Sequence, residues 1–120
     1  MNFSRHRFQS IIIFTAVRWN LQFDLSFRDL EHLLKERGIE VDHTSIYRWV
    51  RKFASKIKPE LSKYRKYTEK WEVKQEAIQI KDNSQYLYEA VDQNGHTLDF
   101  LLSKKKDFKR AERFFSKVLA

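Results

Sequence analysis

The sequence predicts an α+β fold, with a bundle of three helices first, an antiparallel three-stranded sheet next and one helix last. Apolar residues recur at helical spacing as far as about residue 54, and from Trp71 onward the pattern changes to the alternation of extended strands. Two Tyr- and Leu-rich stretches flank Asn94-Gly95, a strong hairpin signal. Helices and strands are therefore expected in separate halves of the chain.

The first two helices are expected over residues 7–21 and from Ser26 onward. In residues 7–21, apolar side chains return every three or four positions and form a broad face that requires burial. Ser26 and Asp29 have the spacing of a capping box, which marks a helix start. Gly38 follows the expected end of this helix, where the backbone often adopts a left-handed conformation that favours glycine.

The third helix is expected from about His43 to Ala54, with Asp42 as its N-cap. One face of this helix carries the apolar residues Ile46, Trp49, Val50 and Phe53, at spacings of three and four. We expect this face, Trp49 included, to pack into the core. His43 at the helix start is suited equally to capping and to contact with a phosphate.

Beyond the third helix, residues 55–70 are basic and are interrupted by Pro59. This stretch is either a linker or a further helix, and we expect a helix that ends near Tyr67. Tyr64 and Tyr67 are suited to packing on the bundle or to stacking on bases. The strands are expected at residues 71–81, 85–91 and 97–102. The last helix is expected at about residues 108–119, with an apolar face of Phe108, Ala111, Phe115 and Val118.

The positive charge is concentrated in one part of the chain. The net charge is +8, and residues 43–70 alone contain nine Lys and Arg against two Asp and Glu. Such a local positive field attracts a polyanion, first of all nucleic acid, then an anionic membrane surface. The alternative is a basic face that is merely solvated.

Several classes of protein are excluded or disfavoured. The absence of Cys excludes disulfide scaffolds and Cys-based zinc sites, and no pair of His has a zinc-binding spacing. No stretch is long and apolar enough to span a bilayer. Because a signal peptide pattern is also missing, we expect a cytoplasmic protein without a membrane partner.

The second and third helices, with a Gly-containing turn between them, form the pattern of a helix-turn-helix. An apolar face that anchors the third helix would hold the opposite face out rigidly, toward a major groove about 12 Å wide. The candidate DNA-binding residues on that face are Thr44, Ser45, Tyr47, Arg48, Arg51, Lys52 and Lys56. We expect Arg48 or Arg51 to pair with guanine, whereas the lysines, together with Lys58, contact phosphates. An ordinary three-helix bundle is the alternative.

Two long segments resemble the transposases of the insertion-sequence-six family: "LSFRDLEHLLKERGIEVDHTSIYRWV" and "YLYEAVDQNGHTLDFLLSKKKD". The similarity runs from about Phe3 to Ala120. It implies an N-terminal helix-turn-helix followed by an RNase H-like domain, here with an incomplete sheet. The family's catalytic site is three carboxylates, Asp-Asp-Glu, that hold two Mg²⁺ ions for displacement at phosphate.

The resemblance places Lys74 at the position of the first catalytic Asp. The segment here reads Trp71-Glu72-Val73-Lys74-Gln75-Glu76-Ala77, and the flanking residues align without a gap. An ammonium group has only donors and a positive charge, so it does not ligate Mg²⁺. Glu72 and Glu76 are expected on the same strand face as Lys74. Asp92 and Asp99 are expected in turn and surface roles.

The sequence thus predicts three parts: a helix-turn-helix domain at 1–58, a basic connector at 59–70 and the first part of an RNase H-like domain at 71–120. The resemblance implies that the second Asp and the Glu of the family lie beyond Ala120, so the chain is interpreted as truncated. The last part is expected to be poorly stable unless it dimerises, because a sheet edge is open. We expect some aromatic residues to lose part of their cover: Trp71, Tyr86, Tyr88 and Phe100.

The sequence therefore predicts a DNA-binding transposase derivative that recognises terminal inverted repeats and is catalytically inactive, with no cofactor of its own. Its expected partners are double-stranded DNA and a second copy or a full-length transposase. The alternatives are a half-enzyme completed in trans, a self-associating adaptor or regulator, and a gene remnant without function. Salt dependence separates DNA binding from the self-associating adaptor. Phosphate contacts weaken as salt rises, whereas apolar self-association survives.

Overall fold

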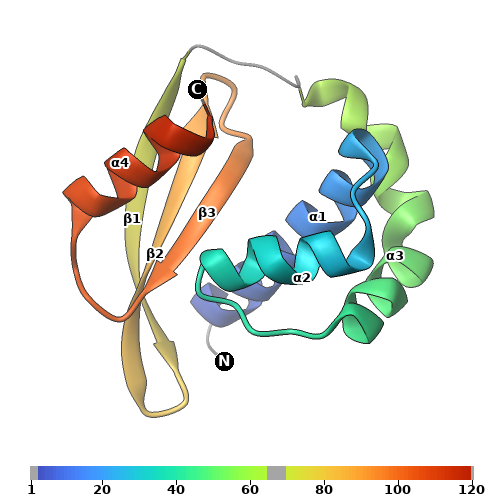
Figure 1. The fold of residues 1–120 in the computed structure, drawn as a ribbon. Helices are drawn as coiled ribbons and strands as arrows, with labels where there is room; N and C mark the ends of the chain where they lie inside the picture. Colours follow the sequence, from blue (N-terminus) through green and yellow to red (C-terminus); the bar gives the residue numbers. More distant parts are fainter. Residues whose placement is uncertain (1–2, 65–69, 120) are drawn as a thin grey trace. The chain divides into compact units, whose positions relative to one another are not determined.

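The fold is α+β, as predicted. The computed structural model describes residues 3–64 and 70–119, with side chains from residue 7 onward. Its elements are α1 (Phe3–Phe23), α2 (Phe27–Glu36), α3 (His43–Ile57), the 3-10 helix η1 (Lys58–Lys63), β1 (Trp71–Ile80), β2 (Asn83–Asp92), β3 (Thr97–Ser103) and α4 (Phe108–Val118) (Figure 1). They form two compact units, the helical unit Gln9–Arg65 and the sheet unit Met1–Phe8 with Lys66–Ala120.

Helix α1 is longer than the predicted 7–21 and contributes several buried apolar residues, Ile12, Ala16 and Val17 among them. It also buries Arg18, whose guanidinium lies 4.8 Å from the centroid of the Tyr64 ring. Tyr64 in turn lies 5.2 Å from the ring of Phe14 and packs on the bundle, one of its two predicted roles. Tyr67 lies outside the described residues.

The start of α2 is fixed by the predicted capping box. The Ser26 hydroxyl accepts a hydrogen bond from the Asp29 backbone N–H at 3.0 Å, and the Asp29 carboxylate accepts one from the Ser26 N–H at 3.2 Å. These bonds satisfy donors that a helix start leaves unpaired. The helix ends at Glu36, and Gly38 just beyond it has a φ of 90°, a conformation that glycine adopts without strain. Leu30 and Leu34 are fully buried.

The end of α3 differs from the prediction. The helix does not stop near Ala54 but continues to Ile57, and η1 follows it directly through Pro59. Proline is tolerated here because it lies in the first turn of η1, where its missing N–H would have no helical acceptor. The helix expected to reach Tyr67 ends earlier, because Tyr64 is already extended, with φ −106° and ψ 113°.

The sheet is antiparallel with strand order β1-β2-β3. Strands β2 and β3 are joined at Asp92–His96, where the Asp92 carbonyl accepts from Gly95 N–H at 3.0 Å and Gly95 has a φ of 83°. The Asp92 carboxylate also accepts bonds from the backbone N–H groups of Asn94 and His96, both at 2.9 Å. The predicted hairpin and the turn role of Asp92 are thus confirmed.

Helix α4 covers one face of the sheet (Figure 1). The core between them consists of Tyr88, Ala90, Leu101, Ala111 and Phe115. The apolar face predicted for α4 is only half right, because Phe108 and Val118, near its two ends, are 40 % and 38 % exposed. Of the four aromatic residues expected to lose part of their cover, Trp71 and Tyr86 are half-buried, whereas Tyr88 and Phe100 are fully buried. The surface role expected for Asp99 is wrong, because it lies in the interior.

Candidate functional site

The predicted DNA-binding residues lie mainly on the outer face of α3. Thr44, Tyr47, Arg48, Arg51, Lys52 and Lys56 are exposed, whereas Ser45 is half-buried. Arg48, Lys52 and Lys56 follow one another at intervals of four residues, so their cations align along a single ridge of the helix. Lys58, at the start of η1, is exposed as well. The structure thus presents a basic, polar helix face to solvent.

The inner face of α3 is anchored less deeply than predicted. Ile46 is fully buried and Ile57 nearly so, whereas Trp49, Val50 and Phe53 are only half-buried. The start of the helix is held by polar bonds instead. The Asp42 carboxylate accepts a bond from the Ser45 N–H at 2.8 Å, which confirms Asp42 as the N-cap.

A carboxylate from α2 fixes the turn between the two helices. Glu31 accepts a hydrogen bond from the His43 backbone N–H at 2.7 Å, and its Oε2 lies 3.3 Å from the His43 ring Nδ1. The backbone bond is the largest cause of a lowered pKa of Glu31. His43 is thus bound by a neighbouring helix, an arrangement that spacing along the sequence did not reveal. The bond sets the position of α3 relative to α2.

Tyr47 and Arg51 form a pair that sequence reasoning also missed. Arg51 Nη1 donates to the Tyr47 hydroxyl at 2.9 Å, and this bond raises the pKa of Arg51 above its ordinary value. The Tyr47 ring packs edge-on against Phe27 of α2, with 5.6 Å between the ring centroids. The Arg51 side chain is thereby oriented through Tyr47 on the exposed face. A separation of four residues along a helix was the available signal.

Lys74 lies on a charged face of the sheet. In the register of β1 and β2, Lys74 is paired with Glu89, and cross-strand partners share a face. Glu72 and Glu76, two positions on either side in β1, lie on this face as predicted. Lys74 is exposed, whereas the Glu89 side chain is only 3 % exposed.

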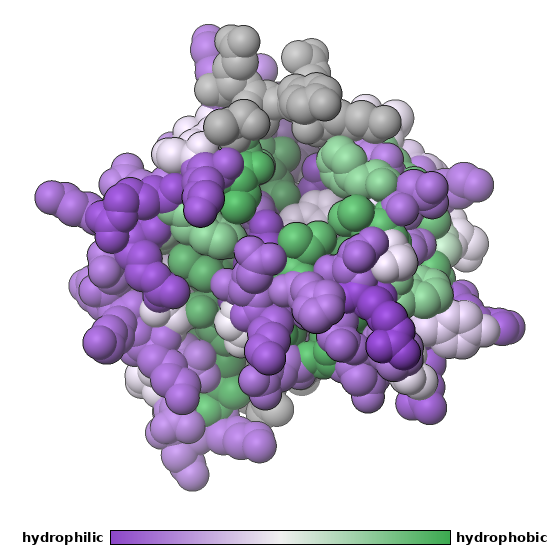
Figure 2. Space-filling view, viewed as in Figure 1, coloured by the Kyte–Doolittle hydropathy of each residue, from purple (hydrophilic) through white to green (hydrophobic). Residues whose placement is uncertain are grey.

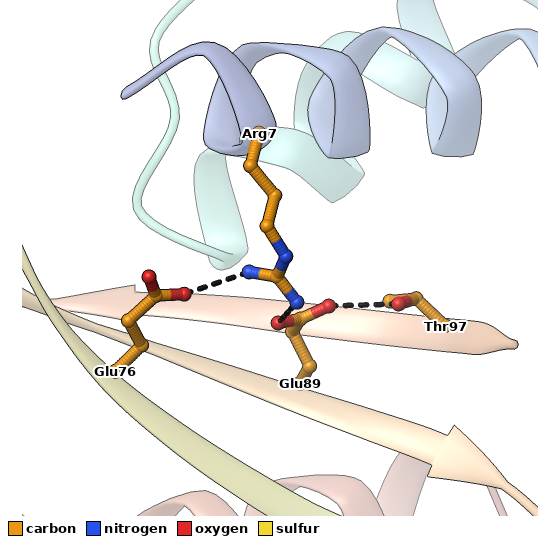
Figure 3. Close-up of polar contacts among 4 residues, drawn as sticks. All are labelled: Arg7, Glu76, Glu89 and Thr97. Carbon is orange, nitrogen blue, oxygen red and sulfur yellow. Dashed lines mark hydrogen bonds and ion pairs between the residues drawn. The ribbon is translucent and has the colours of Figure 1, made fainter. Parts of the chain in front are cut away.

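The buried carboxylate of Glu89 is bound from two directions (Figure 3). The Arg7 guanidinium donates to Glu89 Oε2 and, at 2.7 Å, to Glu76 Oε2. The Thr97 hydroxyl donates to the other oxygen, Glu89 Oε1, at 2.7 Å. The carboxylates of Glu76 and Glu89 are thus bridged by a cation of the protein itself.

This arrangement does not fit a divalent metal site. Residues 3–64 and 70–119 contain no group of three or more His, Cys, Asp or Glu side chains that could hold a metal ion. On the sheet face, Arg7 already bonds the carboxylates and Lys74 adds a second positive charge. A metal ion would have to displace one cation and approach another. The chemistry of a two-metal centre therefore has no support in these residues.

Comparison with known proteins shows that the chain is similar to transposases of insertion sequences. Residues 68–120 match a family model described as a DDE domain. The chain is 37 % identical over 121 residues to the transposase for insertion sequence-like element IS431mec of Staphylococcus aureus, covering 99 % of this chain and 54 % of the relative. It is 36 % identical, with the same coverage, to the transposase for insertion sequence element IS257 in transposon Tn4003, also from Staphylococcus aureus.

These matches support a fragment of an insertion-sequence-six family transposase, as the resemblance predicted. It spans about half the length of the curated relatives it matches. No solved structure matches it. Among the helices of the described residues, none has the length and apolar character needed to cross a bilayer.

Proposed function

We propose that this chain provides the DNA-binding function of an insertion-sequence transposase, acting in the cytoplasm. In this proposal α2, its turn and α3 form a helix-turn-helix, and α3 enters the major groove at the terminal inverted repeats. The observation that carries it is the exposed face of α3, where basic and hydroxyl side chains stand on a helix capped by Asp42 and bonded to Glu31.

The residues on this face have different proposed roles. Arg48 and Arg51 are the candidates for paired hydrogen bonds to guanine, each worth about 1–3 kcal/mol of discrimination. Tyr47 orients Arg51, because its hydroxyl accepts from the guanidinium. Thr44 and Ser45 lie near the helix start, where side chains reach base edges. Lys52, Lys56 and Lys58 contact phosphates and add affinity without sequence preference.

We further propose that the chain alone does not catalyse strand transfer. The support comes from the sheet face, where Lys74, which the resemblance aligns with the family's first carboxylate, is paired in register with Glu89. Arg7 binds Glu76 and Glu89 from above the strands (Figure 3). A chain that binds the ends without cleaving them would occupy sites that a full-length transposase needs.

Binding to a labelled terminal repeat and to a scrambled duplex, across a salt series, tests the DNA-binding proposal. Arg48→Ala and Arg51→Ala are expected to weaken binding to the repeat about ten-fold or more, and binding to scrambled DNA far less. Lys35→Ala removes an exposed cation from α2 and serves as the matched control in the helical unit. Equal affinity of the unaltered chain for both duplexes would contradict element-end recognition.

A further inference from the structure

Charge is segregated within the sheet unit. Residues 71–103, which make up the sheet and its hairpins, contain two Lys against six Asp and Glu. Residues 104–117, the loop before α4 and most of that helix, contain seven Lys and Arg against two Asp and Glu. All nine of these charged residues are exposed. The net charge of residues 71–117 is only +1, but this near balance conceals a basic surface over residues 104–117.

The basic loop is held in place by the core of the sheet unit. At its start, the Ser103 hydroxyl accepts a bond from the Lys105 N–H at 3.2 Å. At its end, the hydroxyl of the buried Tyr88 accepts a bond from the Asp107 N–H at 2.7 Å. The backbone that carries Lys104, Lys105 and Lys106 is thus fixed at both ends.

Helix α4 continues the basic surface. Ala111 and Phe115 are buried against the sheet, so the opposite side of the helix faces solvent. Its outer face carries Lys109, Glu112, Arg113, Ser116 and Lys117 side by side, and Figure 2 shows mainly hydrophilic side chains there. Of the two acidic residues, Asp107 is engaged as the N-cap, its carboxylate accepting from the Arg110 N–H at 3.0 Å. Glu112 alone opposes the cations of the helix.

We propose that this surface, the loop 104–106 and the outer face of α4, binds the phosphate backbone of duplex DNA as a second contact on the sheet unit. The inference rests on the proposed DNA-binding function and extends it to a site outside α3. Charge complementarity favours a duplex, which presents one phosphate charge about every 1.7 Å of its axis. An anionic membrane fits less well, because a membrane-binding helix inserts its apolar face, and that of α4 is used against the sheet.

Backbone contacts of this kind predict a particular salt dependence. Each phosphate contact that is lost makes the slope of log K against log salt shallower by about 0.9, whatever the base sequence. Arg113→Gln with Lys117→Gln tests the helix, and Lys104→Gln with Lys105→Gln and Lys106→Gln tests the loop. The matched control is Lys35→Gln with Lys81→Asn, because both lysines are exposed and outside the proposed surfaces. Asn suits the positive φ of 55° at position 81.

The measurement is fluorescence anisotropy of the labelled repeat and of the scrambled duplex from low to high salt. We expect both patch variants to weaken binding to the two duplexes equally and to lower the slope by about one to three, with the control unchanged. Patch variants that match the control, while Arg48→Ala still removes the preference for the repeat, would overturn only this inference. An unaltered chain that binds neither duplex would overturn it together with the proposed function.

Vesicles that contain phosphatidylserine provide the membrane arm of the test. Binding of the unaltered chain to these vesicles that disappears in the loop variant, without any change in the DNA slopes, would assign the surface to a membrane instead. Melting followed by circular dichroism confirms that the variants are folded. We expect no loss of stability, because the altered side chains are exposed.

Discussion

Glu89 shows how one residue organises the charged face of the sheet. A buried carboxylate is costly unless hydrogen bonds and opposite charges compensate it. Glu89 receives a bond from Thr97 and a charged bond from Arg7, and Lys74 stands opposite it in the neighbouring strand. A change of charge at position 74 is therefore expected to affect the stability of the sheet unit, whatever its role in chemistry.

Replacing Lys74 with Asp is expected to lower the melting temperature. The substitution puts a second carboxylate opposite Glu89, and like charges that face one another across strands destabilise a sheet. The loss should exceed that of Lys74→Asn, which removes the positive charge without adding a negative one. Differential scanning calorimetry with and without Mn²⁺ makes the comparison. Stabilisation of the unaltered chain by Mn²⁺ would contradict our account of this face.

Long-range partners set the limit of sequence reasoning at this scale. The resemblance identified Lys74 and its neighbours because these residues are consecutive in one strand, β1. It did not reveal that Glu89 is buried or that Arg7, 82 positions away along the chain, binds it. The same limit applies to Asp99, expected at the surface. Its pairing with Ala90 puts it in the interior.

At the scale of elements, helix starts could be predicted best. Ser26 and Asp42 were identified as caps because the side chains that bind a helix start lie within three residues of it. Helix ends were harder to predict, as the continuation of α3 into η1 through Pro59 shows. Exposure was harder still to predict. Phe108 and Val118 have helical spacing on α4 but are partly exposed near its two ends, although the Phe108 ring lies 6.3 Å from the ring of Tyr88.

Ser26→Ala is expected to destabilise the helical unit by about 0.5–2 kcal/mol, because the Asp29 N–H loses its side-chain acceptor. Ser26→Asn retains an acceptor and provides the conservative control. Urea unfolding, followed by circular dichroism, measures the difference in the free energy of unfolding. Identical midpoints for the Ala and Asn variants would show that the capping box contributes nothing to stability.

The same helix starts predict loss of stability in acid. Hydrogen bonds from Ser26, His43 and Ser45 lower the pKa values of Asp29, Glu31 and Asp42, whose ordinary values are 3.8, 4.5 and 3.8. A lowered pKa in the folded state stabilises the fold above the ordinary value, and that contribution disappears as pH falls through the lowered one. Melting temperatures should therefore decrease below about pH 4.5, continuing under about pH 3.8.

A variant with Glu31→Gln isolates one of these contributions. Since Gln does not titrate, the decrease in melting temperature between neutral and acidic buffer should be smaller than in the unaltered chain. Glu36→Gln, on the exposed end of α2, removes a carboxylate of the same kind and serves as the control. A steeper acid decrease in Glu31→Gln than in this control would contradict the assigned pKa direction.

At the scale of the whole molecule, the two open edges of the sheet bear on self-association. In the described residues β2 is central, so β1 and β3 each have one edge without a hydrogen-bonded strand. If these edges mediated self-association, sedimentation would show dimers whose fraction depends on protein concentration and persists at high salt. The interaction with DNA, by contrast, is expected to disappear at high salt.

The separation of charge in the sheet unit has a consequence for motion in solution. With acidic strands in one layer and a basic helix and loop in the other, the unit has a dipole as well as a net charge. Near a polyanion such a body experiences a torque that turns its positive layer forward before contact. The sheet unit would thus meet a polyanion with its basic layer already facing it, and fewer encounters would begin at the acidic strands.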